Sequence, residues 1–308
     1  MIELDLLTVP GLGRLYTRGA VASVRTAIES RLGWDGGGLP DVAYLARGVR
    51  ADTDRLMAYQ HLLGESASDV LPAGFVHVLA FPVATALMVR RDFPLPLVGM
   101  VHLANRIEQL RPVSFGDALD VRAHARALRA HQAGTQVELV TEVRLADGEL
   151  AWRGVSTYLA KGTRLPPALP TPLPQVSDPR CARTPARSDT FVAPVPTGQW
   201  RLAGDVGRRY AVVSGDRNPI HLSALAARAL GFPRAIAHGM YTASRALATV
   251  GAARTETFTW TVEFAAPVLL PGTVTLRVAA DDVAPGFAYA GWNAGSGKIH
   301  LTGTVVPR

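Results

Sequence analysis

The stretch Leu71–Val89, LPAGFVHVLAFPVATALMV, is almost uninterrupted apolar sequence, and it aligns without gaps on Phe232–Val250, FPRAIAHGMYTASRALATV. The alignment places His77 on His238. The first copy approaches the roughly 20 apolar residues that a membrane-spanning helix requires, but proline and glycine interrupt it and the second copy carries arginine. We therefore predict no membrane span, and instead a buried central helix in each copy, apolar on most sides because other structure surrounds it.

Two more blocks repeat in the same order around this helix. Upstream, Val49–Gly64 aligns on Trp200–Gly215, and downstream a Glu and a Pro recur with the same spacing. The matched pairs are Tyr59 with Tyr210, Gly64 with Gly215, Glu108 with Glu263 and Pro112 with Pro267. We interpret both tyrosines as packing aromatics. The chain therefore contains two copies of one structural unit.

Alternating, β-branched stretches bounded by Gly and Pro follow each central helix, a pattern typical of antiparallel strands with one buried face. These stretches are Leu119–Leu128, Thr135–Arg144 and Leu150–Ala160 in the first copy, and Phe258–Ala265, Thr273–Ala280 and Lys298–Val305 in the second. The predicted fold class is α+β, with a helix and a strand meander in each half.

The domain organisation follows from the repeat. Residues 1–48 form an N-terminal extension, and 49–161 the first half. Residues 162–196 are rich in proline and read as an extended linker, and 197–308 form the second half.

Composition excludes several classes of protein. The chain has 308 residues, 48% of them hydrophobic and 19% charged, which is enough apolar sequence for a large core. Lys161 and Lys298 are the only lysines, and the arginines that carry most of the net charge of +7 are scattered. Without a basic block, nucleic-acid binding is not expected, although the charge favours phosphate-bearing or acidic partners.

The cysteine content indicates the compartment. The single cysteine, Cys181, excludes an intrachain disulfide and a cysteine-rich zinc site, and no signal peptide is visible. A reducing cytoplasm fits these features.

The second copy contains about ten residues that the first lacks, within the string Ser214-Gly215-Asp216-Arg217-Asn218-Pro219-Ile220-His221. Asn218 is a favoured N-cap and Pro219 a favoured first helical residue, so we predict a helix that runs from here to Leu230. His221 then lies in the first turn and Asp216 just before the cap, at the same end of the helix.

A carboxylate and an imidazole so placed can hold one water and move a proton in either direction near neutral pH. Asp216 and His221 are therefore the candidate catalytic pair. Metal ligation would need a third ligand, and none is evident nearby in the sequence, so we expect no metal and no cofactor. Taken singly, the alternatives are a surface histidine and a capping carboxylate.

His238-Gly239-Met240 begins the second central helix. The Gly239 amide at a helix N-terminus could stabilise a developing oxyanion, such as a thioester enolate. His238 has a counterpart in His77 within the copy that lacks the catalytic pair, which favours a structural role.

The second copy resembles the MaoC-like, (R)-specific enoyl-thioester hydratase family. The residues that carry the resemblance are Tyr210, Ser214-Gly215-Asp216, Asn218-Pro219-Ile220-His221, Ala226, Gly231-Phe232, Ile236 and His238-Gly239-Met240. Ser223 departs from the pattern, since many members have an acidic residue there, and we expect the change to affect helix-surface packing. The string from Asn105 to Val113 resembles the degenerate N-terminal halves of the double hot dog members.

The resemblance implies a double hot dog fold, with two antiparallel sheets joined side by side and each wrapped around its central helix. It implies that Asp216 and His221 activate water, that Asn218 supports their loop, and that the Gly239 amide binds the thioester carbonyl oxygen. The implied reaction is hydration of trans-2-enoyl thioesters to (R)-3-hydroxyacyl thioesters and its reverse, on coenzyme A or acyl carrier protein. We also expect the first half to house a longer acyl chain against Phe75, Leu79 and their neighbours.

Two other functions remain open at this stage. A non-catalytic thioester-binding partner subunit would keep the fold without activity, and a hot dog thioesterase would hydrolyse the thioester bond itself. A homodimer is allowed but not required, because two sheets already pair within one chain.

Overall fold

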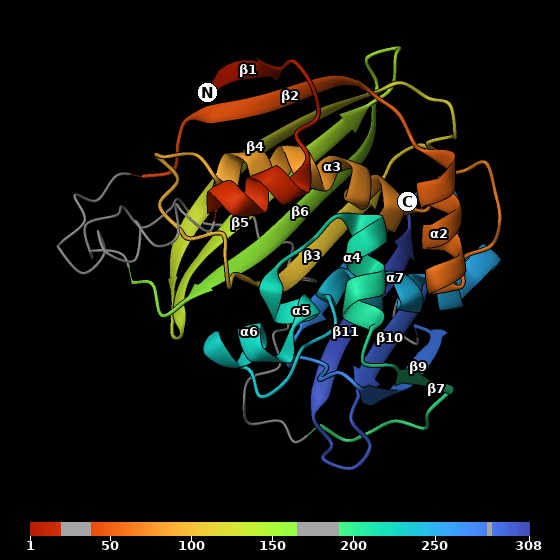
Figure 1. The fold of residues 1–308 in the computed structure, drawn as a ribbon. Coiled ribbons are helices and arrows are strands. Elements are labelled where there is room, and N and C mark those ends of the chain that lie inside the picture. Colours follow the sequence, from red (N-terminus) through yellow and green to blue (C-terminus); the bar gives the residue numbers. More distant parts are fainter. Residues whose placement is uncertain (20–37, 165–190, 282–284) are drawn as a thin grey trace.

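The computed structural model describes residues 1–19, 38–164, 191–281 and 285–308 (Figure 1). Its first half contains two main helices and a run of long strands, preceded by helical residues 12–19. The elements are β1 (Ile2–Leu6), β2 (Val42–Val49), α2 (Thr53–Leu63), α3 (Ala73–Met88), β3 (Val101–Gln109), β4 (Leu119–His131), β5 (Gly134–Arg144) and β6 (Leu150–Lys161).

The second half repeats this order and inserts two short helices. Its elements are β7 (Gly198–Leu202), α4 (Val206–Ser214), α5 (Pro219–Leu222), α6 (Ala224–Ala229), α7 (Gly239–Val250), β8 (Phe258–Phe264), β9 (Gly272–Ala280), β10 (Phe287–Trp292) and β11 (Ile299–Pro307). The helices α2 and α4 correspond, as do the central helices α3 and α7, so the predicted duplication is confirmed.

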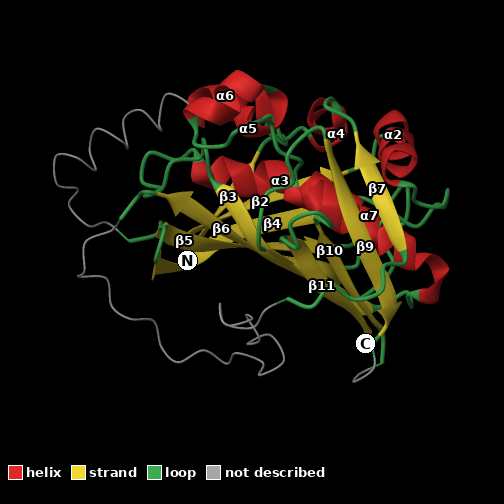
Figure 2. Ribbon diagram, turned by 90° about the horizontal axis from the view of Figure 1, so that it is seen from below, coloured by secondary structure: helices red, strands yellow, loops and turns green. Residues whose placement is uncertain are grey.

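The strands form one 11-stranded sheet in the order β1-β2-β4-β5-β6-β3-β8-β11-β10-β9-β7. The two halves join where β3 pairs antiparallel with β8, with Arg106 opposite Thr261 and Ile107 opposite Trp260. The sheet curves around the helices, which lie on one side of it (Figure 2). This is the predicted arrangement of two sheets side by side.

The helix α3 is the core of the first half. Every one of its residues from Ala73 to Met88 is buried, and it packs against β2, β4, β5 and β6. Burial of a large aliphatic or aromatic side chain stabilises a fold by about 1.5–3 kcal/mol, so a mostly apolar helix is expected in this position. Within the described ranges, no helix is long and apolar enough to cross a membrane.

The two central helices differ at their N-terminal ends. In the gap-free alignment their C-terminal ends differ by one position, since α3 ends at Met88 and α7 at Val250. However, α7 begins at Gly239 with His238 as its N-cap, whereas His77 lies inside α3, past the first turn. The matched histidines are therefore not equivalent in structure.

The turns after α2 and α4 are equivalent. Each helix buries a tyrosine, Tyr59 or Tyr210, and ends at a left-handed glycine, Gly64 with φ 73° and Gly215 with φ 74°. Glycine adopts this conformation without the steric cost that a side chain would add.

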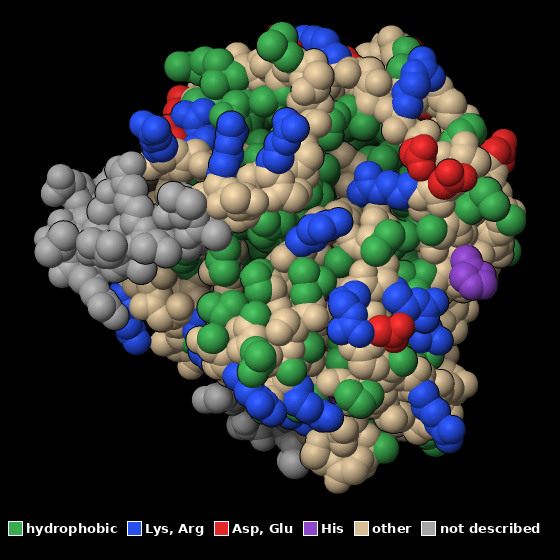
Figure 3. Space-filling model, in the orientation of Figure 1, with side chains coloured by type: hydrophobic (Ala, Val, Ile, Leu, Met, Phe, Trp, Pro, Cys, Tyr) green, Lys and Arg blue, Asp and Glu red, His purple; other side chains and the backbone are tan. Residues whose placement is uncertain are grey.

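Several strands were not predicted from the sequence: β1, β2, β3, β7 and β10. The boundary placed after residue 48, between the N-terminal extension and the first half, falls inside β2. This strand pairs with β4 of the first half, and β1 extends the sheet parallel to β2. Most of the predicted linker, residues 165–190, lies outside the described residues, as does Cys181. Lysine and arginine side chains are spread over the face shown in Figure 3 without forming one large patch.

Candidate active site

The loop that carries Asp216 is held where it leaves α4. Arg55 of α2 donates hydrogen bonds to the backbone oxygens of Val213 (2.6 Å) and Ser214 (3.1 Å), two of the carbonyls left free at the end of α4. The Ser214 hydroxyl accepts a hydrogen bond from the Asp216 amide at 3.1 Å. The first half of the molecule therefore helps to position the loop of the second.

His221 lies on the short helix α5. This helix begins at Pro219 after Asn218, as predicted, but it ends at Leu222 instead of continuing to Leu230. Ser223 breaks it in an extended conformation, and its hydroxyl caps α6 by accepting from the Ala226 amide. Ser223 thus acts at a helix boundary, a role more specific than the surface packing expected from the sequence.

The backbone at His221 is approached closely by α4. A Cβ added to Gly207 would lie 2.1 Å from the His221 carbonyl oxygen, so only glycine allows this packing. The His221 ring is fixed by a hydrogen bond of 2.9 Å between Nδ1 and the Ile236 carbonyl oxygen. Because a carbonyl oxygen only accepts, Nδ1 carries the proton and Nε2 of the neutral ring is left with a free lone pair.

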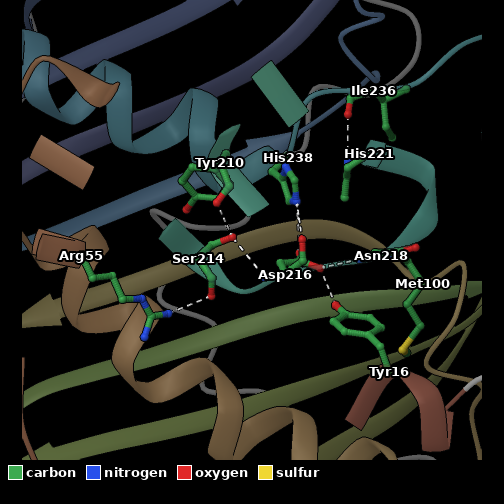
Figure 4. Close-up of polar contacts among 10 residues, drawn as sticks. All are labelled: Tyr16, Arg55, Met100, Tyr210, Ser214, Asp216, Asn218, His221, Ile236 and His238. Atoms are coloured by element: carbon green, nitrogen blue, oxygen red, sulfur yellow. Dashed lines mark hydrogen bonds and ion pairs between the residues drawn. The ribbon is translucent and has the colours of Figure 1, made fainter. Parts of the chain in front are cut away.

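His238 lies beside both members of the pair (Figure 4). Its Nε2 donates to the Asp216 backbone oxygen at 3.0 Å, and its ring stacks on His221 with a centroid distance of 3.7 Å. Its Nδ1 is buried without a hydrogen-bond partner among the described residues. This geometry gives His238 a positioning role that the sequence did not specify.

Asp216, His221 and His238 each present a nitrogen or carboxylate oxygen, and these three atoms lie within 4.8 Å of one another. Such a separation lets one water form hydrogen bonds of about 2.8 Å to two of them. His238 is distant from His221 along the chain but close in space, so the fold adds a third possible ligand that spacing in the sequence did not show. One nitrogen of each imidazole is already bonded to a backbone carbonyl, and for His238 it is the same Nε2 that lies 3.8 Å from Asp216 Oδ2.

Burial and neighbouring groups set the protonation states. Burial lowers the pKa of His221 below its usual value although Asp216 opposes this, and lowers the pKa of His238 to about 3. Burial raises the pKa of Asp216, but His238, His221 and hydrogen bonds from Tyr16 and the Asn218 amide outweigh it, so the pKa is low. At neutral pH the site therefore holds a carboxylate beside two neutral imidazoles.

Gly239 is the first residue of α7, as predicted, so its amide has no acceptor within the helix. A Cβ at this position would lie 2.9 Å from the ring of Phe264, so the close approach requires glycine. The amide lies at the positive end of a helix that borders the cavity beside His221.

Asn218 is the N-cap of α5, but its side chain makes no capping hydrogen bond. Its Nδ2 donates to the Met100 carbonyl oxygen at 3.4 Å, and its Oδ1 is buried without a partner in the described part of the chain. The side chain therefore ties the loop to the first half and leaves one acceptor beside the cavity.

Tyr16 was missed by the sequence analysis. It lies in the helical segment 12–19, and its hydroxyl donates a short hydrogen bond to Asp216 Oδ1 (Figure 4). Leu12 of the same segment covers Gly215, where an added Cβ would lie 2.6 Å from a Leu12 methyl group. The one available signal was the helical spacing of Leu12, Leu15 and Tyr16, which are all buried.

These groups line one cavity of about 100 Å³ that extends from the second half into the first. The residues that reach it from α3 are His77, Val78, Phe81 and Met88. Phe75 and Leu79, which we expected to contact an acyl chain, do not line it. Phe75 instead packs edge-on against Tyr59 at 5.2 Å.

The chain matches the family described as MaoC like domain over residues 180–291. It is 35% identical over 272 residues to 3-hydroxyacyl-thioester dehydratase X of Mycobacterium tuberculosis, an alignment that covers 87% of this chain and 90% of the relative. The crystal structure of HtdX from M. tuberculosis has a TM-score of 0.73 and 33% identity, covering 86% of this chain and 100% of that one.

A more distant structural likeness concerns the fold alone. A conserved hypothetical protein of M. tuberculosis with a double hotdog fold has a TM-score of 0.52 and 14% identity, with coverage of 83% of this chain and 92% of that one. The identity to the dehydratase over nearly its whole length, together with the domain match, shows that this chain belongs to the MaoC-like dehydratase family.

Proposed function

We propose that the protein hydrates trans-2-enoyl thioesters to (R)-3-hydroxyacyl thioesters and catalyses the reverse dehydration. The observation that carries this proposal is that a carboxylate oxygen of Asp216 and a ring nitrogen of His221 lie within 4.8 Å of each other at a shared cavity. The relative 3-hydroxyacyl-thioester dehydratase X supports the same reaction class.

In the hydration direction, water lies between Asp216 and His221. The carboxylate accepts one hydrogen bond from the water, and His221 Nε2 takes the other proton as the oxygen adds to C3 of the substrate. The C2–C3 π electrons move toward the thioester carbonyl and form an enolate. Return of the proton from the pair to C2 completes the addition of one water molecule.

The enolate oxygen needs a donor that does not depend on protonation. The Gly239 amide, at the N-terminus of α7, supplies it, and the helix dipole favours the developing negative charge. Loss of one oxyanion donor typically costs enzymes about 10²–10³ in kcat. Asn218 holds the loop between the two halves in place through Met100.

The stereochemistry follows from the position of the pair. Both groups belong to the second half, and the equivalent turn of the first half has no Asn-Pro-Ile-His string. Water is therefore delivered from one side of the substrate, which gives a single enantiomer. The (R) product is the one that the family resemblance implies.

A second cavity supports the proposal that the acyl group is attached to a phosphate-bearing carrier. It shares Met100 and Val101 with the main cavity, and the exposed Lys161 borders it. A lysine at this place suits the phosphate of a pantetheine arm, which both coenzyme A and acyl carrier protein possess.

Incubation with crotonyl-CoA tests the proposal. Loss of enoyl absorbance with the thioester intact is the expected result, and chiral analysis of the product should give the (R) enantiomer. Release of free thiol would instead support a thioesterase. Binding without any change in the substrate would support a non-catalytic partner subunit.

A further inference from the structure

The part of the cavity that lies in the first half carries polar aromatic side chains among apolar ones. His77 of α3, His102 of β3 and Tyr158 of β6 line the same cavity as Asp216 and His221. An acyl pocket for plain alkyl chains needs only apolar walls, because methylene groups cannot form hydrogen bonds with the polar atoms of imidazole and phenol groups. These three side chains therefore call for a ligand of another kind.

His77 is held in place by aromatic contacts alone. Its ring stacks on Phe81 with a centroid distance of 5.9 Å and lies 6.4 Å from the ring of Trp152. The residue is only 7% exposed and makes no hydrogen bond to any residue in the described ranges. Burial lowers the pKa of His77 to about 4, so at neutral pH it offers one N–H donor and one nitrogen acceptor.

His102 and Tyr158 form the opposite wall. Their rings stack at 4.4 Å, and His102 also lies 6.4 Å from His77. The Nε2 atom of His102 is buried without a partner in the described part of the chain. Buried polar groups are nearly always hydrogen-bonded, so the unpaired Nε2 of His102, beside the His77 ring, indicates that a ligand or water completes it.

A small side cavity of about 10 Å³ lies behind His77 and Tyr158, and Thr141 and Ser156 border it. This space is about what one water-sized group occupies. Among the described residues that line the two cavities, Asp216 is the one charged side chain. A charged substituent would have no counter-ion at this end, so the site suits a neutral oxygen.

We propose that His77, His102 and Tyr158 form a subsite for a neutral oxygen substituent, a hydroxyl or keto group, carried on the acyl chain beyond the reacting carbons. A hydroxyl can accept from one of these groups and donate to an unprotonated imidazole nitrogen, and a keto oxygen can accept from the tyrosine hydroxyl or an imidazole N–H. The inference rests on the proposed function and names the substrate class of that site.

The test compares pairs of trans-2-enoyl-CoA thioesters of equal chain length, one plain and one with a hydroxyl or keto group at successive positions beyond C4. The expected result is that kcat/KM for one oxygenated position exceeds that of the plain chain by about 10- to 100-fold, the range for a buried hydrogen-bonding site that one substrate satisfies and the other does not. The proposal would be overturned if the plain chain had the same kcat/KM as the oxygenated chain for every position of the oxygen.

Two variants assign the preference to these side chains. His77→Phe and Tyr158→Phe keep the ring and lose the hydrogen-bonding atoms, so each should reduce the preference at least severalfold while crotonyl-CoA is still hydrated. The matched control Leu97→Val changes an apolar wall of the same cavity, and it should affect oxygenated and plain chains alike. A preference that survives in both His77→Phe and Tyr158→Phe would contradict the assignment.

Binding of saturated acyl-CoA thioesters, which cannot be hydrated, separates this inference from the proposed reaction. Calorimetric titration should give a dissociation constant about tenfold lower for the matching oxygenated chain than for the plain chain. If crotonyl-CoA is not hydrated but this difference is found, the proposed reaction fails and the subsite stands. Equal affinities would overturn the subsite whatever the reaction.

Discussion

The turn after α2 and the turn after α4 have the same backbone conformation at their glycine but differ in chemistry. In both, a helix with a buried tyrosine ends at a left-handed glycine, and an acidic residue follows: Glu65 in the first half, Asp216 in the second. Glu65 forms an ion pair with Arg254 at 3.2 Å, and its side chain is only 4% exposed. Asp216 is 23% exposed and lies beside His238, with its other oxygen bonded to Tyr16.

The protonation of the two acids differs accordingly. Burial raises the pKa of Glu65, although Arg254 opposes this. The pKa of Asp216 is lowered, because the two histidines and two hydrogen-bond donors outweigh its burial. The comparison shows how a duplicated turn can keep one acid for stability, tied to a cation, and use the other at a cavity that admits substrate.

The largest expected effect is a difference in catalytic activity between variants of the two turns. His221→Ala should lower kcat for crotonyl-CoA hydration by about 10²–10⁴, the usual contribution of an acid/base group. Glu65→Ala should leave kcat within about twofold of wild type, because Glu65 contacts Arg254 and not the cavity. Equal losses in the two variants, measured on folded protein by steady-state kinetics, would remove the distinction.

The second prediction concerns stability: Glu65→Ala, which should hardly change activity, should lower the free energy of unfolding. Glu65→Ala removes the acidic partner of Arg254, whose side chain is 20% exposed and still donates to two backbone carbonyls, and loss of a charged hydrogen-bonded contact costs about 1.5–3 kcal/mol. Urea unfolding followed by circular dichroism measures this loss. The double variant Glu65→Ala with Arg254→Leu serves as the control and should recover part of it. An unchanged unfolding midpoint in Glu65→Ala would show that the ion pair has no structural role.

Acid should destabilise the protein through its buried histidines. The pKa of His77 is lowered to about 4 and those of His102 and His238 to about 3, all mainly by burial. Below about pH 6.5 the unfolded chain therefore binds more protons than the folded chain. The free energy of unfolding decreases as the pH is lowered. Each group should contribute about 1 kcal/mol between pH 6.5 and 5.5. Denaturation at both pH values, with His77→Phe showing a smaller difference than wild type, checks this prediction.

The smallest effect concerns Tyr16. Tyr16→Phe removes the hydrogen bond that helps to keep the pKa of Asp216 low, so that pKa should rise. Less of the carboxylate is then ionised in acid, and the acid limb of the pH profile of kcat/KM should move to higher pH, with less than a tenfold loss at pH 8. An unmoved acid limb would mean that Tyr16 only packs against the site.

Local chemistry made part of this structure predictable. The alternation of apolar residues indicated six strands, and Asn218-Pro219 marked the start of α5 because capping and proline preferences are properties of neighbouring residues. The break at Ser223 was not predicted, because a serine can either continue a helix or act as the N-cap of a new one. Strand β10 is short, which left its alternation too brief to recognise.

Contacts made across the fold were beyond reach of the sequence. Tyr16 meets Asp216 from 200 positions away, and nothing in either local sequence specifies that contact. The alignment with His77 indicated a structural role for His238, but the two histidines differ because α3 begins more than one turn earlier in the alignment than α7. Its stacking on His221 depends on how α5 and α7 pack.

The turnover of Asp216→Asn, measured beside Glu65→Gln, tests the central claim most directly. Both changes remove a negative charge, keep the shape of the side chain and alter equivalent turns. Hydration of crotonyl-CoA should fall by at least about 10² in Asp216→Asn and by less than about twofold in Glu65→Gln. Turnover by Asp216→Asn close to that of wild type would contradict the account.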